Sequence, residues 1–126
     1  MAGLTKKDIV YFKDLLLEKR KEVQKVIEER KRNNLREDNE VMVEEIDQAT
    51  KASEQALNLR LLDKDLKLLT EIDNALVKID DGNYGICEGT GDWIERKRLE
   101  IRPWTRYSIE HKQELERRKK ASKFGT

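Results

Sequence analysis

The sequence predicts a mainly α protein: an antiparallel two-helix coiled-coil hairpin, a small zinc-finger-like globular base that lacks metal, and a C-terminal helix. Three observations favour this fold class. Charged residues make up 42% of the 126 residues and aromatic residues only 6%, which suits long helices with a narrow buried seam. Two long stretches carry apolar residues at helical spacing, with an acidic stretch between them. Four of the six glycines then cluster between residues 82 and 91, where they end the second stretch.

Residues 1–36 are predicted to form the first coiled-coil helix, which we expect to begin near Lys6. Thr5 and Asp8 have the spacing of a capping box, although Glu or Gln is the usual partner. No Gly or Pro interrupts the following stretch. Its apolar residues fall mostly on one helical face: Ile9, Phe12, Leu15, Leu16, Val23, Val26 and Ile27.

Residues 49–81 are predicted to form the second coiled-coil helix, beginning near Asp47 or Gln48. Gly82 is expected to end it, because the sequence Asp-Gly-Asn-Tyr-Gly follows. Two such helices joined by a short segment fold back as an antiparallel hairpin. The apolar residues of this stretch are three or four apart, which predicts a near-heptad seam of Leu59, Leu62, Leu66, Leu69, Ile72, Leu76 and Ile79.

Residues 37–48 are predicted to form an acidic tip between the two helices. Residues 1–36 carry eleven Lys or Arg and six acids, or +5, whereas residues 37–50 carry six acids and no base, or −6. A long stretch without a base, next to such a basic region, indicates more than a solvated turn. The tip also contains four apolar residues, which either cap the coiled coil or dock into a basic cleft of a partner: Val41, Met42, Val43 and Ile46.

Residues 82–107 are predicted to be a degenerate zinc finger. Cys87, Thr90, Ser108 and His111 have the spacing of a C-x2-C…C-x2-C module. Only the cysteine and the histidine can ligate a metal, so we expect no zinc and no metal site at these vestigial positions. Cys87 is then a small buried cysteine, with a weak zinc site that recruits outside ligands or a redox-active thiol as alternatives.

A hydrophobic cluster is expected to replace the metal, packed on Tyr84 and the base of the hairpin. The hydroxyl groups of Thr90 and Ser108 are expected to hydrogen-bond across the former metal position. Short extended pieces are expected around Trp93 and Leu99, and residues 108–126 are predicted to form a C-terminal helix and a basic tail. The predicted cluster consists of Trp93, Ile94, Leu99, Ile101, Trp104, Tyr107 and Ile109.

Several classes of function are disfavoured by composition. No apolar run approaches the ~18 residues of a membrane span, and the N-terminus lacks the apolar stretch of a signal peptide. One cysteine forms no internal disulfide, so a cytoplasmic location is expected. One histidine and one cysteine without evident acid or base partners do not make a catalytic site, and we expect no enzyme activity. No recognition helix supports sequence-specific DNA binding.

Several ordered motifs resemble the DksA/TraR family. They are residues 81–88 (DGNYGICE), 98–103 (RLEIRP), 44–50 (EEIDQAT), 56–60 (ALNLR) and 63–69 (DKDLKLL). The resemblance implies a regulator that binds bacterial RNA polymerase through its secondary channel and modulates initiation at ribosomal RNA promoters in the stringent response. It also implies that the tip presents Glu44, Asp47 and Ala49 near the polymerase active site, although the family's first acid is an aspartate.

The same resemblance implies the alarmone ppGpp as a possible co-regulator. The matching positions are Lys64, Lys67 and Leu68 on the second helix and Lys112 on the last one. Glu71 stands where a basic residue is expected, which disfavours a polyphosphate unless another base compensates. The alternatives are a secondary-channel factor linked to elongation or repair, and a generic coiled-coil scaffold. A monomer is expected for the first two and a dimer for the scaffold.

Overall fold

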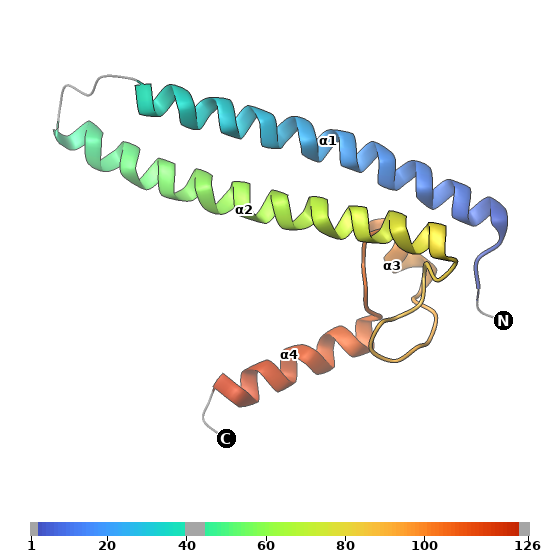
Figure 1. Cartoon of the computed structure of the whole chain (residues 1–126). Coiled ribbons are helices and arrows are strands. Elements are labelled where there is room, and N and C mark those ends of the chain that lie inside the picture. The colour runs from blue at the N-terminus through green and yellow to red at the C-terminus, as the bar shows by residue number, and fades with distance from the viewer. Residues whose placement is uncertain (1–2, 40–44, 124–126) are drawn as a thin grey trace. The chain divides into compact units, whose positions relative to one another are not determined.

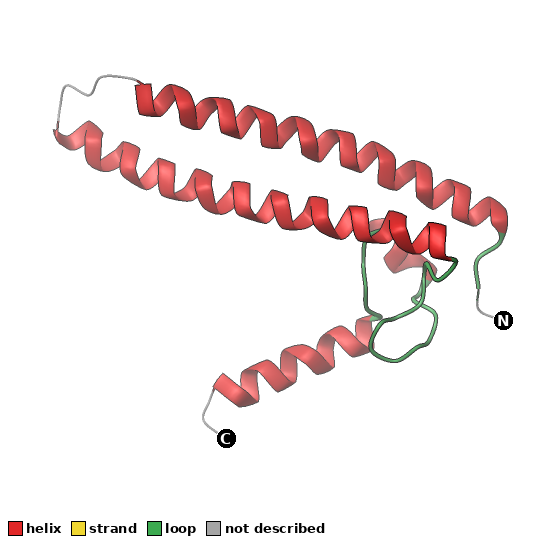
Figure 2. Cartoon of the chain, viewed as in Figure 1, coloured by secondary structure: helices red, strands yellow, loops and turns green. Residues whose placement is uncertain are grey.

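Four helices make up most of the described part of the chain (Figures 1 and 2). The computed structural model describes residues 3–39 and 45–123, and the side chains of residues 34–48 and 123 lie outside the described set. The helices are α1 (Lys6–Asn39), α2 (Glu45–Asp81), α3 (Arg96–Ile101) and α4 (Ile109–Lys123). The described ranges contain no strand beyond one isolated antiparallel bridge, between Ile86 and Trp93. The predicted mainly α fold class with a helical hairpin is confirmed.

The chain divides into two compact units. We call Met1–Leu17 together with Glu71–Thr126 the terminal unit, and Glu18–Thr70 the hairpin unit. The terminal unit contains the beginning of α1, the end of α2, and all of α3 and α4. The hairpin unit contains the rest of α1 and α2, which run antiparallel to one another (Figure 1).

Helix α1 begins as its capping box predicts. The backbone N–H of Thr5 donates to Oδ2 of Asp8 at 3.0 Å, and the N–H of Asp8 donates to the Thr5 hydroxyl at 3.2 Å. The helix continues to Asn39, three residues past the predicted end at Arg36. Four members of the predicted apolar stripe are at most 5% exposed, which confirms that face as the buried one: Phe12, Leu16, Val23 and Ile27.

Helix α2 differs from the prediction at its start and in its seam. It begins at Glu45, so residues 45–48 are helical, and it ends before Gly82, whose φ of 82° suits a glycine. Ile72 is fully buried as predicted, but Leu59 is 56% and Leu66 40% exposed. The predicted seam is wrong at these two leucines. Asn58 and Asp65, one residue before each leucine, take part in the contact with α1 instead.

The region after α2 contains one helix that the sequence did not indicate. Leu99 was expected in an extended piece, but it lies in α3 and is fully buried. That prediction was wrong because α3 has only six residues and its N-cap residue, Glu95, makes no side-chain capping bond. Helix α4 follows Ser108, whose Oγ accepts the backbone N–H of His111 at 3.3 Å in the manner of an N-cap.

The core of the terminal unit forms around Tyr84. This residue is 4% exposed, its ring lies 5.9 Å from that of Phe12, and its hydroxyl donates to the carbonyl oxygen of Pro103 at 2.7 Å. Ile94 and Leu99 are buried members of the predicted cluster. The cluster prediction was wrong for three other members, whose side chains are 39%, 76% and 43% exposed: Trp93, Ile101 and Ile109.

Candidate functional site

Two of the vestigial zinc positions, Thr90 and Ser108, contact the sulfur of a third, Cys87. Sγ accepts hydrogen bonds from the Thr90 hydroxyl and from the backbone N–H groups of Ser108, Thr90 and Gly89. Burial opposes ionisation of this thiol, which is 1% exposed, but the hydrogen bonds outweigh burial and lower its pKa to about 7. The His111 ring lies directly over Gly89 and 5.0 Å from the ring of Tyr107. We call residues 87–91 together with Ser108 and His111 the knuckle.

The donor set at this knuckle does not fit a resident structural zinc. Such a site closes with four nitrogen or sulfur ligands, and here one thiol and one imidazole are present. The Thr90 hydroxyl accepts the N–H of Asp92 at 3.2 Å, and the Ser108 hydroxyl accepts the N–H of His111. The Thr90 hydroxyl therefore bonds to the Cys87 sulfur, as expected of a bond across the former metal position, whereas the Ser108 hydroxyl bonds to the backbone of α4. The described ranges, 3–39 and 45–123, contain no group of three or more metal-ligating side chains.

Glu88 ties the knuckle to two other parts of the terminal unit. Its Oε1 and Oε2 accept from Nη2 and Nε of Arg106 at 3.2 and 3.1 Å, and Oε2 also accepts from Nζ of Lys78 on α2. The backbone N–H of Glu88 donates to the carbonyl oxygen of Arg106 at 2.9 Å. Burial raises the pKa of Glu88, but the hydrogen bonds from Arg106 and Lys78 lower it by more. The net pKa is therefore below the usual value, and the carboxylate is ionised at neutral pH.

The N-terminus of α1 contacts the same region from another side. Oδ1 of Asp8 accepts from Nη1 of Arg96 at 2.7 Å, and this bond is the main cause that lowers the pKa of Asp8 to about 2. The Arg96 guanidinium also lies 5.5 Å from the ring centre of Phe12. At Gly85 an added Cβ would lie 3.0 Å from Leu4. These contacts anchor the region between α2 and α4 to the first helix.

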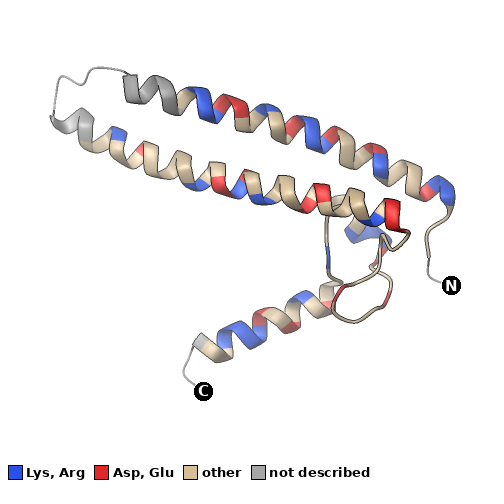
Figure 3. Ribbon diagram, in the orientation of Figure 1, with Lys and Arg blue, Asp and Glu red and all other residues tan. Residues whose placement is uncertain are grey.

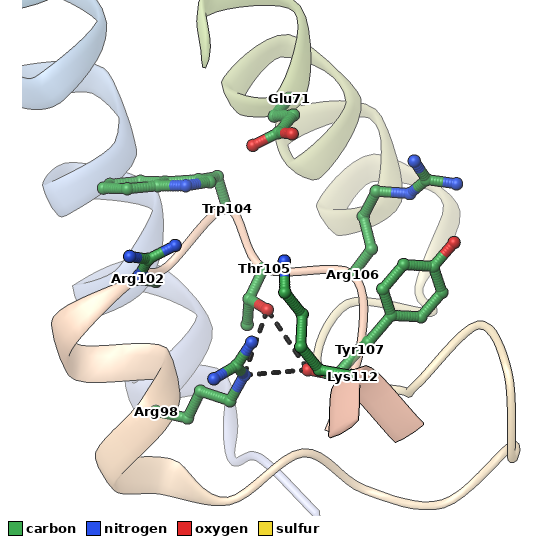
Figure 4. Close-up of a pocket in the computed structure, with 8 residues that line it drawn as sticks. All are labelled: Glu71, Arg98, Arg102, Trp104, Thr105, Arg106, Tyr107 and Lys112. Atoms are coloured by element: carbon green, nitrogen blue, oxygen red, sulfur yellow. Dashed lines mark hydrogen bonds between the residues drawn. The ribbon is translucent and has the colours of Figure 1, made fainter. Parts of the chain in front are cut away.

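A small cationic pocket of about 110 Å³ is the second candidate site (Figure 4). Helix α2 contributes Glu71, helix α4 contributes Lys112, and the segment around α3 contributes the remaining lining residues. Arg106 is already paired with Glu88, and the other three basic side chains against one acid still give the pocket a positive charge that suits an anion. The lining residues are Glu71, Arg98, Arg102, Trp104, Thr105, Arg106, Tyr107 and Lys112.

Hydrogen bonds fix two of the pocket arginines. Nε of Arg98 donates to the carbonyl oxygen of Tyr107 at 2.9 Å and to the Thr105 hydroxyl at 3.3 Å (Figure 4). Arg106 is bound to Glu88 and lies 5.1 Å from the Tyr107 ring centre. The bond to Glu88 is the main cause that raises the pKa of Arg106. Segment 105–107 is therefore held from both sides, and it forms one wall of the pocket.

The predicted ppGpp-facing residues fall in different units. Lys112 lines the pocket of the terminal unit, whereas Lys64, Lys67 and Leu68 belong to the hairpin unit. Lys67 forms an exposed ion pair with Asp63 at 3.0 Å. The structure adds three arginines that sequence reasoning missed. These are Arg98, Arg102 and Arg106. Their spacing of four residues is a signal in the sequence, but it did not indicate a shared site because residues 83–107 were predicted to be irregular.

The predicted tip residues are only partly described. Glu44 lies outside the described residues, and Asp47 lies in α2 with its side chain outside the described set. Ala49 is an exposed residue of α2. Figure 3 shows acidic and basic residues interspersed along the described parts of α1 and α2, with basic residues frequent in α4.

Fold and sites together define a class: a helical-hairpin protein with a finger-like base, a vestigial metal knuckle and an adjoining cationic pocket. Residues 8–79 match the family described as DnaK suppressor protein DksA, N-terminal domain. Residues 82–117 match the prokaryotic dksA/traR C4-type zinc finger. The chain therefore belongs to the DksA/TraR family. Its knuckle departs from the four cysteines that give the second match its description.

Individual relatives agree with this assignment. The chain is 36% identical over 114 residues to the RNA polymerase-binding transcription factor DksA of Caulobacter vibrioides, covering 90% of this chain and 80% of the relative. It is 37% identical over 75 residues to the protein of that name in Escherichia coli K12, and this match covers 60% of this chain and 50% of the relative. The solved structure of transcription factor DksA2 from Pseudomonas aeruginosa matches with a TM-score of 0.80 and 35% identity. The match covers 91% of this chain and 88% of the DksA2 chain. These relatives are named as transcription factors and not as enzymes.

No helix within the described residues is both long and apolar enough to cross a membrane.

Proposed function

We propose that this protein binds bacterial RNA polymerase through the secondary channel and modulates transcription initiation, including ribosomal RNA promoters in the stringent response. It acts as a cytoplasmic monomer and does not read DNA sequence. The observation that carries the proposal is the family match over both the hairpin and the base, with a TM-score of 0.80 to DksA2. A polymerase-binding relative that spans 90% of this chain supports the same partner.

The acidic tip is the proposed working end. Residues 37–50 carry six acids and no base, and a channel of opposite charge attracts such a segment. Glu44, Asp47 and Ala49 are proposed to act near the polymerase active site by biasing initiation complexes rather than by performing chemistry. The hairpin unit supports this role because it contains both the end of α1 at Asn39 and the start of α2 at Glu45, the helices on either side of this acidic stretch.

Transcription in vitro from a ribosomal RNA promoter tests this proposal. The chain is expected to inhibit with the cognate polymerase, and Asp47→Asn to abolish inhibition while polymerase binding persists. Glu54→Gln is the matched control, because it removes an exposed carboxylate from the same helix of the same unit. Equal loss in both variants, or retained inhibition in Asp47→Asn, would overturn the role of the tip.

The cationic pocket is the proposed contribution to ppGpp binding. Arg102 and Lys112 offer cationic donors at a pocket that Arg98 also lines, and Arg and Lys suit phosphate oxygens by charge and geometry. Glu71 lines the same pocket and opposes a polyanion, so the arginines are proposed to compensate for it. Lys64, Lys67 and Leu68 remain proposed partners on α2.

Measuring the ppGpp effect on inhibition separates these contributions. Lys112→Ala and Arg102→Ala are expected to remove the ppGpp enhancement without removing basal inhibition. Glu71→Lys is expected to increase the enhancement, because it replaces the one acid of the pocket with a base. An enhancement that none of the three substitutions changes would show that ppGpp does not use this pocket.

We propose further that the protein folds and acts without zinc. The knuckle has two of the four ligands that a structural site requires, and Glu88, Tyr84 and Arg96 supply contacts that hold the region in place. Purified protein is expected to contain less than one zinc per chain and to keep its thermal midpoint in a chelator. A stoichiometric metal, or a midpoint that falls on chelation, would refute this.

A further inference from the structure

The hairpin unit contains a polar contact at a place where apolar packing is expected. On α1, Arg30 lies seven residues after Val23 and three after Ile27, both 5% exposed, so it continues their buried stripe. On α2, Asn58 and Asp65 are half-buried and seven residues apart. The seam between the two helices therefore changes from apolar to polar at Arg30.

Arg30 bonds to both residues at once. Its Nε donates to Oδ2 of Asp65 at 2.8 Å and its Nη1 to Oδ1 of Asn58 at 3.3 Å, while Nδ2 of Asn58 donates to the Arg30 carbonyl oxygen at 3.5 Å. The side chains of Arg30 and Asp65 are only 27% and 20% exposed. One guanidinium thus spans two turns of α2, which only the planar fork of arginine achieves with two simultaneous bonds.

Apolar residue type alone does not favour the observed face of α2 at this point. A stripe that includes Leu59 and Leu66 is more apolar than one that includes Asn58 and Asp65. The structure leaves these two leucines 56% and 40% exposed and turns Asn58 and Asp65 inward. A different rotation, or a slip by one turn of ~5.4 Å, would separate Arg30 from its acceptors. Polar residues at single seam positions fix register in coiled coils in this way.

We propose that Arg30, Asp65 and Asn58 form a positioning cluster that selects the rotation and register of α2 against α1 in the hairpin unit. The cluster favours one helix pairing over others. It adds little net stability, because the desolvation penalty of a half-buried ion pair offsets much of its electrostatic attraction. As far as it concerns presentation of the acidic tip, this inference rests on the proposed function. As far as it concerns helix pairing, it stands independently.

Distances between spin labels test the cluster in the isolated protein. Labels are attached at Glu28→Cys on α1 and Glu54→Cys on α2, both exposed positions of the hairpin unit, in a Cys87→Ser background. The parent is expected to give one narrow distance distribution. An apolar seam variant is expected to keep or raise the thermal midpoint yet give a broadened distribution, or one displaced by ~5 Å or more. It carries Arg30→Leu, Asn58→Leu and Asp65→Leu.

Two further variants keep the test decisive. Arg30→Lys retains the charge without the fork and is expected to give an intermediate width. Arg30→Met is used if the triple variant does not remain a folded monomer, and a broadened distribution is expected for it too. A single narrow distance distribution, unchanged from the parent, overturns the proposal if it is found in the triple variant, or in Arg30→Met where that variant replaces it. Because no polymerase is present, failure of the proposed function leaves this result unaffected.

Discussion

Gly89 and His111 form a packing pair whose strength can be worked from the structure. A methyl group at position 89 would lie 2.1 Å from Nε2, 2.2 Å from Cε1 and 2.3 Å from Cδ2 of the His111 ring. Ordinary contacts lie near ~3.5–4 Å. The ring would have to leave its place against Gly89 and its contact with Tyr107, whose ring centre is 5.0 Å away.

The expected cost follows from measured overpacking. Gly89→Ala should destabilise the terminal unit by about 1–3 kcal/mol. His111→Ala alone should cost about 1 kcal/mol, the centre of single substitutions. In the double variant the methyl group occupies space that the ring has vacated. The total cost should therefore stay near ~1 kcal/mol instead of the sum, a coupling of about 1–3 kcal/mol.

Urea unfolding followed by tryptophan fluorescence measures this cycle, because both tryptophans belong to the terminal unit. Gly91→Ala is the matched control. Its φ of 78° strains any side chain, but nothing lies within 4 Å of an added Cβ, so His111→Ala should not rescue it. Additive effects of Gly89→Ala and His111→Ala, or a neutral Gly89→Ala, would refute the reasoning.

Further predictions concern the hydrogen bonds that hold the finger-like region. Tyr84→Phe removes the buried donor to Pro103 and should cost about 1–3 kcal/mol in urea unfolding, because the carbonyl is left unsatisfied; an unchanged midpoint would contradict this. The Asp8 pKa is lowered in the folded state from 3.8 to about 2, so its contribution is complete above pH 4 and is lost as pH falls from about 4 to 2. The free energy of unfolding of Asp8→Asn should not show this loss of stability between about pH 4 and 2. Parallel plots of unfolding free energy against pH for the parent and Asp8→Asn would contradict this.

The long helices could be predicted because their signals are local. The reciprocal bonds of Thr5 and Asp8 connect residues three apart, and the apolar stripe of α1 has helical spacing without Gly or Pro. Gly82 ends α2 through its own backbone conformation. Such features depend on neighbouring residues only, so the sequence carries them directly.

The faces and the pocket could not be predicted because distant partners decide them. Which side of α2 is buried depends on Arg30, which lies 28 residues from Asn58 and 35 from Asp65. Helix α3 lacks a capping signal, and its Arg98 reaches the pocket through the carbonyl oxygen of Tyr107. The four vestigial positions were recognised by spacing, yet their hydrogen-bond roles depend on the fold of the loop.

The bond between Asp8 and Arg96 joins residues 88 positions apart, and the terminal unit is built from both ends of the chain. During synthesis the hairpin unit is complete once Thr70 has emerged, whereas the first 17 residues must wait for α3 and α4. The hairpin unit is thus, in topological terms, an insertion into a discontinuous unit. Contacts of such long sequence separation form slowly, so folding on the ribosome should proceed from the middle of the chain outward to its ends.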